Sequence, residues 1–64
     1  MKLIEFSKGD KKVYVNPNFI GYIEALQTGH TAIYFTNKDG YVKVTENVKD
    51  VLKKIENANK LRNL

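Results

Sequence analysis

Hydrophobic and polar residues alternate in several short segments of the chain, and the tyrosines fall on the opposite side from the aliphatic residues. The pattern is clearest in Val13-Tyr14-Val15, Ile33-Tyr34-Phe35 and Tyr41-Val42-Lys43-Val44. Because successive side chains of a strand point to opposite faces, it predicts β-strands with one apolar face turned to a core. The residues expected on that core face are Val13, Val15, Ile33, Phe35, Val42 and Val44.

Turn-forming residues separate the predicted strands, which are expected near residues 2–6, 11–16, 19–26, 31–36 and 41–44. Ser7-Lys8-Gly9-Asp10 and Asn37-Lys38-Asp39-Gly40 predict hairpin turns, and Pro17 predicts a change of chain direction. The loop of the second hairpin can have two or four residues, and because these lengths differ by an even number, both place Phe35 on the same face as Val42 and Val44. The same parity places Tyr34 beside Tyr41 or Lys43.

The segment 19–26 alternates less cleanly than the other predicted strands. Phe19, Ile23 and Ala25 would lie on one side, and the other side would carry Ile20, Tyr22, Glu24 and Leu26. Since apolar residues occur on both sides, this segment is predicted to be a central strand or an interface strand.

After residue 46 the apolar period changes from two to about 3.6, which predicts an amphipathic helix over residues 48–61. Asn47 is the expected N-cap, with Asp50 three residues further on. The predicted fold class is α+β: one domain over residues 1–64, with a small antiparallel sheet of four to five strands and this C-terminal helix packed on its core face. The apolar stripe of the helix consists of Val48, Val51, Leu52, Ile55, Ala58 and then Leu61 or Arg62.

The small size of the chain bears on how it is stabilised. With 64 residues, no cysteine and one histidine, it has neither disulfides nor a histidine- and cysteine-rich metal site to supplement a small core. Self-association remains, and we therefore expect a homo-oligomer. The absence of cysteine fits a cytoplasmic location, and no apolar run reaches the length of a membrane span, so no membrane association is expected.

Eleven basic and seven acidic residues give a formal net charge of +4. This balance favours anionic partners, with a solvated lysine-rich surface as an equally weighted alternative. Ten of the eleven basic residues are lysines, whereas proteins that grip phosphates more often use arginine.

The inventory of reactive side chains argues against catalysis. One histidine, His30, sits in a loop without a carboxylate nearby in the sequence, and Ser7 is expected to cap a turn. The seven acidic residues show no pairing or clustering of the kind that metal sites need. We therefore expect a protein that is not an enzyme, with no cofactor and no metal.

The reverse face of the predicted sheet is the candidate site. Aromatic rings with neighbouring lysines can stack nucleobases and meet phosphates, but tyrosines are also enriched where proteins contact one another. For so small a chain the protein interface is favoured by about two to one. The candidate ligand or interface residues are Lys12, Tyr14, Tyr34, Tyr41 and Lys43.

A series of short motifs extends over about the first 56 residues: Met1 to Phe6, Gly9, Lys12, Val15-Asn16, Ile20-Gly21-Tyr22-Ile23-Glu24-Ala25, Lys38-Asp39-Gly40-Tyr41-Val42-Lys43-Val44 and residues 48–55. The order of these motifs resembles the small FlbD (SwrD) family of flagellar accessory proteins. The chain differs from that family at residues 26–30, where members usually carry a Pro-Asp-Thr type turn. The pattern Ile-x-Tyr-Ile-Glu followed by a hairpin and a helix is also similar to part of the LytTR class of DNA-binding domains.

Three functional hypotheses follow. The favoured hypothesis is a non-catalytic binding module that acts as a homo-oligomer and, as the resemblance to the flagellar family implies, serves as an adaptor or accessory protein for a protein partner. The first alternative is an oligomer that sequesters an anionic, nucleotide-like small molecule, in the manner of phage anti-defence proteins. The second alternative is nucleic-acid binding, for which affinity should fall steeply with salt.

Overall fold

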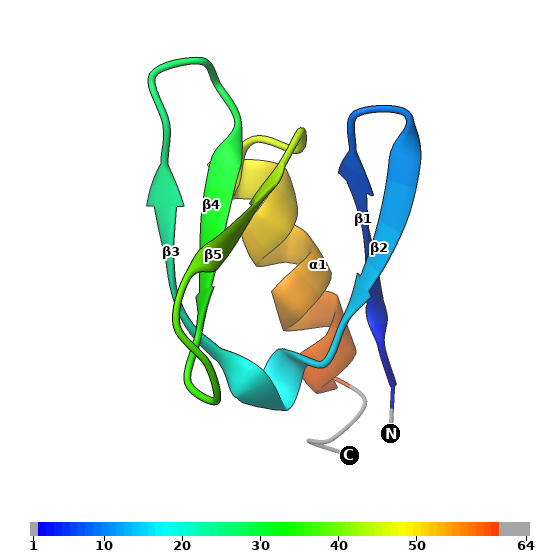
Figure 1. Cartoon of the computed structure of the whole chain (residues 1–64). Coiled ribbons are helices and arrows are strands. Elements are labelled where there is room, and N and C mark those ends of the chain that lie inside the picture. The colour runs from blue at the N-terminus through cyan, green and yellow to red at the C-terminus, as the bar shows by residue number, and fades with distance from the viewer. Residues whose placement is uncertain (1, 61–64) are drawn as a thin grey trace.

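The computed structural model describes residues 2–60, and five strands and one α-helix form around a shared core (Figure 1). In chain order the elements are β1 (Ile4–Lys8), β2 (Lys11–Val15), the 3-10 turn η1 (Pro17–Phe19), β3 (Ile20–Ala25), β4 (Thr31–Phe35), β5 (Tyr41–Val44) and α1 (Val48–Lys60). The predicted α+β class is confirmed. The part of the predicted helix at residue 61 lies outside the described residues.

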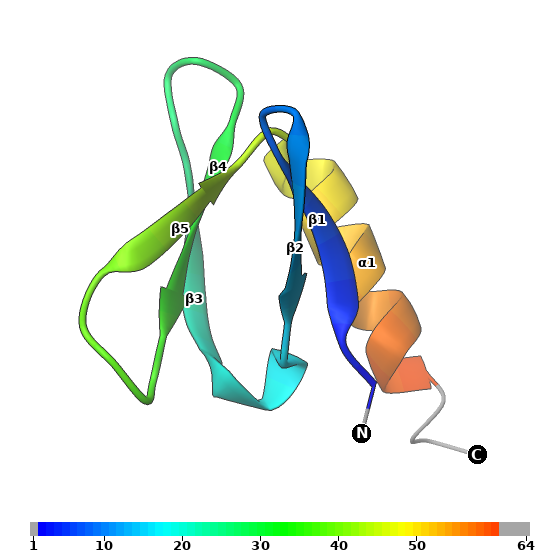
Figure 2. The same ribbon diagram turned by 45° about the vertical axis from the view of Figure 1, so that its right-hand side comes forward.

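The five strands are divided between two antiparallel sheets rather than joined in one. One sheet has two strands in the order β1-β2, and the other has three in the order β3-β4-β5. Figure 2 shows the two sheets meeting near the end of β5 and diverging away from that point, with α1 packed behind. At the meeting point the Thr45 backbone N–H donates a hydrogen bond of 2.8 Å to the Ser7 carbonyl oxygen.

Two hairpins arise where the sequence predicts them. Gly9 and Gly40 have φ angles of 65° and 89°, values that cost a residue without a Cβ little. In the second hairpin Tyr34 pairs with Tyr41 and Ile33 with Val42. Tyr41 rather than Lys43 therefore lies opposite Tyr34, and Phe35 packs against the core from the same side as Val42, as the parity argument predicts.

β3 departs from its predicted alternation because the pairing register shifts between Ile20 and Tyr22. A bulge of this kind leaves one extra residue in the strand, here Gly21, and moves the residues before it to the other face. Ile20 consequently pairs with Phe35 and packs against the core, whereas Tyr22 pairs with Tyr34 on the outside. β3 is an edge strand and β4 is central. Of the two alternatives predicted for this segment, the central strand is therefore wrong, and the interface strand stays a prediction.

The core lies between the two sheets and the helix. Its buried apolar members include Phe6, Ile33 and Val51, each 0% exposed. Ile55 and Ala58 extend the same contact along the helix. Leu52 is predicted to be part of the apolar stripe that packs on the core, but it is 53% exposed, so this part of the prediction is wrong. The Asp50 backbone N–H donates a 2.9 Å hydrogen bond to Asn47 Oδ1, which confirms Asn47 as the N-cap. In the described part of the chain, no helix has the length and hydrophobicity needed to cross a membrane.

Glu46 connects both sheets to the helix. Its side chain is 14% exposed, and both carboxylate oxygens accept the Ser7 backbone N–H at 3.0 Å. Lys54 Nζ reaches the same carboxylate at 3.3 Å and also donates to the Glu5 carbonyl oxygen at 2.6 Å. The Glu46 carbonyl oxygen accepts the hydroxyl of buried Thr31 at 2.8 Å. We call this set of contacts the Glu46 junction.

Replacing the Glu46 carboxylate should therefore destabilise the whole fold. Glu46→Gln keeps the size of the side chain but removes the charge that meets Ser7 and Lys54, and we expect it to lower the free energy of unfolding at neutral pH by about 2 kcal/mol. Urea unfolding followed by circular dichroism measures this change. The control is Glu56→Gln on the exposed side of α1, for which a change below about 0.5 kcal/mol is expected.

The same junction predicts how stability depends on pH. Partial burial tends to raise the pKa of Glu46, but hydrogen bonds from the backbone N–H groups of Ser7 and Glu46 and the contact with Lys54 outweigh it, so that the pKa lies below its ordinary value of 4.5. A lowered carboxyl pKa contributes stability above the unfolded-state pKa and loses it as the pH falls through the folded-state pKa. The stability difference between wild type and Glu46→Gln should accordingly shrink on acidification. A constant difference would contradict this assignment.

Candidate functional site

The outer face of the β3-β4-β5 sheet carries two rows of side chains that run across the strands. Tyr22, Tyr34 and Tyr41 pair across the strands in one row, and Glu24, Ala32 and Lys43 pair in the next. We call this surface the tyrosine face. Because directly opposed side chains in neighbouring strands lie close together, each row is continuous across all three strands.

The tyrosine row is a stacked aromatic surface. The rings of Tyr22 and Tyr34 are 4.3 Å apart between centroids and nearly parallel, with an interplanar angle of 8°. Tyr41 continues the row with its centroid 5.1 Å from that of Tyr34 and a tilt of 39°. Tyr22 is 61% and Tyr41 57% exposed, while Tyr34 between them is half-buried. The two outer rings therefore present most of the aromatic area available for binding.

The second row has opposite charges at its two ends. Glu24 lies on β3, Lys43 lies on β5, and both are exposed. Ala32, on the central strand between them, is 0% exposed. Across this row the charges cancel, although the whole chain carries a net charge of +4. This distribution does not favour a polyanion on the tyrosine face.

A hydrogen bond links the two rows. Tyr34 Oη donates to Glu24 Oε1 at 3.1 Å. Desolvation raises the pKa of Tyr34 above its ordinary value of 10.0, and the hydrogen bond to the Glu24 carboxylate and its negative charge raise it further. The bond connects the central ring of the tyrosine row to the acidic end of the second row.

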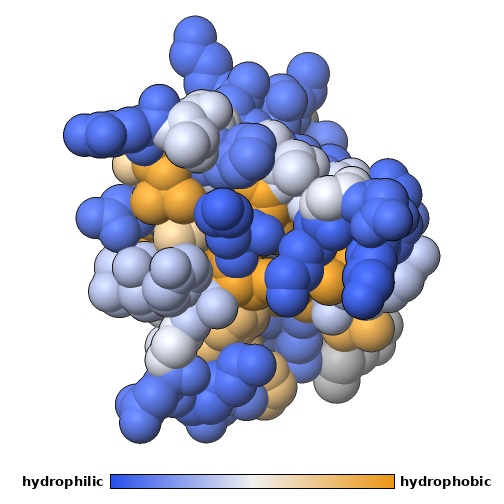
Figure 3. All heavy atoms as spheres, turned by 45° about the horizontal axis from the view of Figure 1, so that its top comes forward, coloured by the Kyte–Doolittle hydropathy of each residue, from blue (hydrophilic) through white to orange (hydrophobic). Residues whose placement is uncertain are grey.

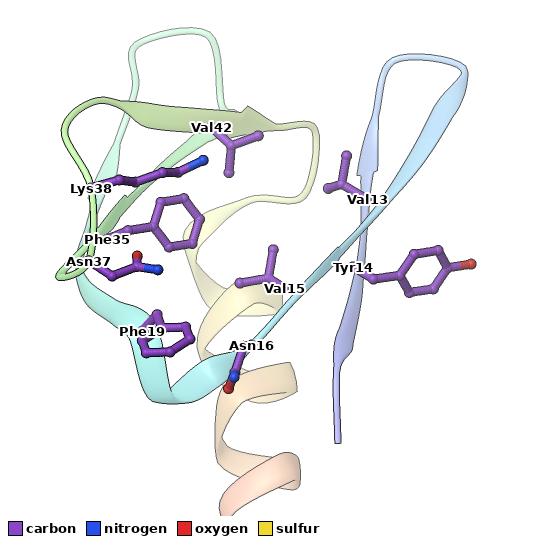
Figure 4. Close-up of a pocket in the computed structure, with 9 residues that line it drawn as sticks. All are labelled: Val13, Tyr14, Val15, Asn16, Phe19, Phe35, Asn37, Lys38 and Val42. Carbon is purple, nitrogen blue, oxygen red and sulfur yellow. The ribbon is translucent and has the colours of Figure 1, made fainter. Parts of the chain in front are cut away.

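The five residues predicted for the site are not all brought together. Tyr34, Tyr41 and Lys43 lie on the tyrosine face as expected. Lys12 and Tyr14 belong to the other sheet, where both lie close to Glu5: Lys12 Nζ is 3.8 Å from Glu5 Oε2, and Tyr14 Oη donates to Glu5 Oε1 at 3.4 Å. Figure 4 shows Tyr14 pointing away from the space between the sheets.

Two residues of the tyrosine face, Tyr22 and Glu24, are missing from the predicted set. Strict alternation places Ile20 on the side of Tyr22 and Glu24, so the segment 19–26 looks apolar on both sides; the bulge at Gly21 turns Ile20 to the core and leaves Tyr22 and Glu24 outside. The signal that could identify Tyr22 is the glycine before it, since a glycine inside a strand often marks a bulge. A Cβ at Gly21 would lie 3.3 Å from Thr36 Cγ2 and 3.5 Å from the Tyr34 carbonyl oxygen.

The reactive side chains considered in the sequence lie apart from this face. His30 is half-buried in the loop between β3 and β4 rather than fully exposed, and its Nδ1 is buried without a hydrogen-bond partner among the described residues. Ser7 donates its backbone N–H to Glu46, and its Oγ accepts a hydrogen bond from Lys12 Nζ at 3.0 Å. Within residues 2–60, no three side chains of the metal-binding types gather closely enough to hold an ion.

The hydrogen bond between Tyr34 and Glu24 can be tested by titration. With tyrosine rings labelled with carbon-13, the Tyr34 resonance should titrate at a higher pH in the wild type than in Glu24→Gln, because the variant lacks the carboxylate that opposes ionisation. Glu5→Gln is the matched control, since it removes the corresponding bond to Tyr14 on the other sheet and should leave the Tyr34 pKa unchanged. Equal Tyr34 pKa values in wild type and Glu24→Gln would show that the bond is not formed in solution.

Comparison of the chain with protein-family models, with curated proteins and with solved structures finds no match. The resemblance to the flagellar accessory family therefore remains a prediction from short motifs. The physical properties of the tyrosine face, its stacked rings and the opposite charges at the two ends of its second row, are the basis for a functional proposal.

Proposed function

We propose that this protein is a non-catalytic binding module that acts as a homodimer, with the tyrosine face as the contact between the two copies. The observation that carries the proposal is the charge pattern of that face. Glu24 and Lys43 occupy opposite ends of one row, with the small Ala32 between them. A row of this kind is complementary to itself.

The geometry of the self-complementary contact follows from symmetry. Two identical faces packed against each other are related by a two-fold axis. An axis that runs parallel to the strands, above β4 and midway between the two copies, exchanges the two edges of the sheet. It therefore places Glu24 of one copy opposite Lys43 of the other, twice, and sets the tyrosine rows against each other.

The size of the face indicates how strong the dimer is. Three strands about 4.8 Å apart and about five residues long span roughly 10 Å by 17 Å, which is well below the roughly 800 Å² that each partner buries in a typical stable interface. The dimer should therefore be weak and depend on concentration. The aromatic rings supply most of its stabilisation, and the exposed ion pairs supply orientation more than affinity.

The protein partner in this proposal comes from the resemblance to the flagellar accessory family. A dimer presents two copies of every other surface, and two linked contacts raise the apparent affinity for a partner that can engage both. The balanced charges of Glu24 and Lys43 make the tyrosine face a poorer match for the phosphates of a nucleotide or nucleic acid than for an identical protein surface. Titration with ATP and with single-stranded DNA tests these two alternatives directly.

Removing the exposed rings should weaken the dimer. In the double variant Tyr22→Thr/Tyr41→Thr, the β-branched replacement suits a strand and half-buried Tyr34 is retained. We expect sedimentation equilibrium to show a shift from dimer to monomer at concentrations where the wild type associates. Tyr14→Thr is the matched control, because Tyr14 is 58% exposed, almost the same as Tyr22 and Tyr41, but lies on the other sheet. Dissociation caused by the Tyr14 change and not by the double change would refute the proposal.

Reversing single charges tests the symmetry of the contact. In Glu24→Lys, the new lysine of each copy would face Lys43 of the other copy. In Lys43→Glu, the new carboxylate of each copy would face Glu24 of the other. Each variant alone should therefore associate less than the wild type, because like charges face each other. A mixture of the two variants restores opposite charges in a heterodimer, and the double variant restores them in a homodimer.

Sedimentation of each variant, of their equimolar mixture and of the double variant measures these outcomes. Recovery of association in the mixture would show that the weaker association of each single variant is not caused by misfolding, because the mixture contains the same two variant proteins. If neither the mixture nor the double variant recovers association, the two-fold axis does not run along β4.

A further inference from the structure

On the opposite side of the β3-β4-β5 sheet, the divergence of the two sheets leaves a groove that the core does not fill. It has a volume of about 330 Å³ and lies between β2, the inner side of β4 and β5, and η1. Figure 3 shows apolar atoms left visible among polar side chains at the surface. The apolar side chains that line the groove are Val13, Val15, Phe19, Phe35 and Val42.

The positively charged side chain of Lys38 lines this apolar groove. Figure 4 shows Lys38 extending from the β4–β5 turn across Phe35 towards Val42. Its Nζ is 5.1 Å from the centroid of the Phe35 ring. In the described part of the chain no carboxylate forms an ion pair with Lys38, and the adjacent Asp39 is not among the residues that line the groove. The ammonium group is thus held over an apolar wall without an acidic partner.

The neighbouring polar groups are also suited to an anion. The Asn37 side chain lines the groove beside Lys38, and an amide can donate hydrogen bonds to a carboxylate oxygen. Phe19, at the other end, is 43% exposed and leaves the apolar wall accessible. The volume lies at the lower end of the range of small-molecule sites.

We propose that the groove binds a small amphipathic carboxylate, with its apolar chain along Val13, Val15 and Phe35 and its carboxylate at Lys38 and Asn37. An uncharged apolar molecule would leave the Lys38 ammonium without a partner, and a cation would be repelled by it. Because the groove and the tyrosine face lie on opposite sides of the sheet, this site is separate from the dimer contact and does not depend on it.

Octanoate is a suitable probe, and its uncharged analogue 1-octanol reports the contribution of the carboxylate. Titration of the nitrogen-15 labelled protein with octanoate should give saturable chemical-shift changes at Val13, Val15, Phe35 and Val42. We expect octanoate to bind more tightly than 1-octanol, and Lys38→Gln to weaken octanoate binding by about fivefold while leaving 1-octanol binding unchanged. Lys38 is exposed in a turn, so this change should not prevent folding.

Two controls separate the site from other effects. Lys43→Gln changes an exposed lysine on the opposite side of the same sheet and should leave octanoate binding unchanged. Glu24→Lys, which is designed to weaken the dimer, should still bind octanoate, so failure of the dimer proposal and failure of this one are distinguishable.

Several results would overturn the proposal. They are the absence of saturable shifts in the groove, equal affinities for octanoate and 1-octanol, and an equal loss of affinity in Lys38→Gln and Lys43→Gln. Groove shifts that depend on protein concentration without octanoate would show that a second copy of the chain occupies the groove instead.

Discussion

The partly buried carboxylate of Glu46 links three elements of the fold, and the packing of the small sheet, the larger sheet and the helix depends on it. Glu46 accepts the Ser7 backbone N–H from β1 and contacts Lys54 of α1, while its own carbonyl oxygen accepts the Thr31 hydroxyl from β4. A two-stranded hairpin such as β1-β2 is marginal by itself in water, and a small domain buries too little surface to tolerate loose parts. The Glu46 junction holds the hairpin, the larger sheet and the helix together beside the core that all three share.

Joining the sheets at one point has consequences for both proposed sites. Where the sheets meet, Thr45 continues the hydrogen bonding of β5 onto Ser7, and Phe6 and Val44 are fully buried. Away from that point the sheets diverge, and Val13, Phe35 and Val42 line a groove instead of closing it. The same division places Tyr14 on a separate outer surface from the stacked tyrosines. The tyrosine face and the groove thus lie on opposite sides of the β3-β4-β5 sheet, and the small sheet and the helix cover its inner side only in part.

Much of this fold could be predicted because its local patterns agree with its tertiary contacts. The alternation around Ile33, Tyr34 and Phe35 identifies inward and outward residues correctly, since a strand period of two leaves no freedom once one face is buried. The helix period and the Asn47 cap are equally local. Leu52 shows the limit, because an apolar residue at the edge of a helical stripe is covered only if a neighbouring element reaches it. The candidate site is predicted in part: Tyr34, Tyr41 and Lys43 come from clean alternation, whereas Tyr22 and Glu24 lie in a strand whose parity a bulge reverses.

Local sequence patterns were enough to predict the secondary elements, the two hairpins and the side to which most strand residues point, because these follow from backbone periodicity and from turn residues close along the chain. The division of the strands into two sheets, the separation of Tyr14 from Tyr34, and the role of Glu46 as the junction of both sheets with the helix became visible only in the folded chain. Those features depend on contacts between residues far apart in sequence, such as Ser7 with Glu46 across 39 positions. No local pattern specifies such contacts, since they result from how the assembled elements share one small core.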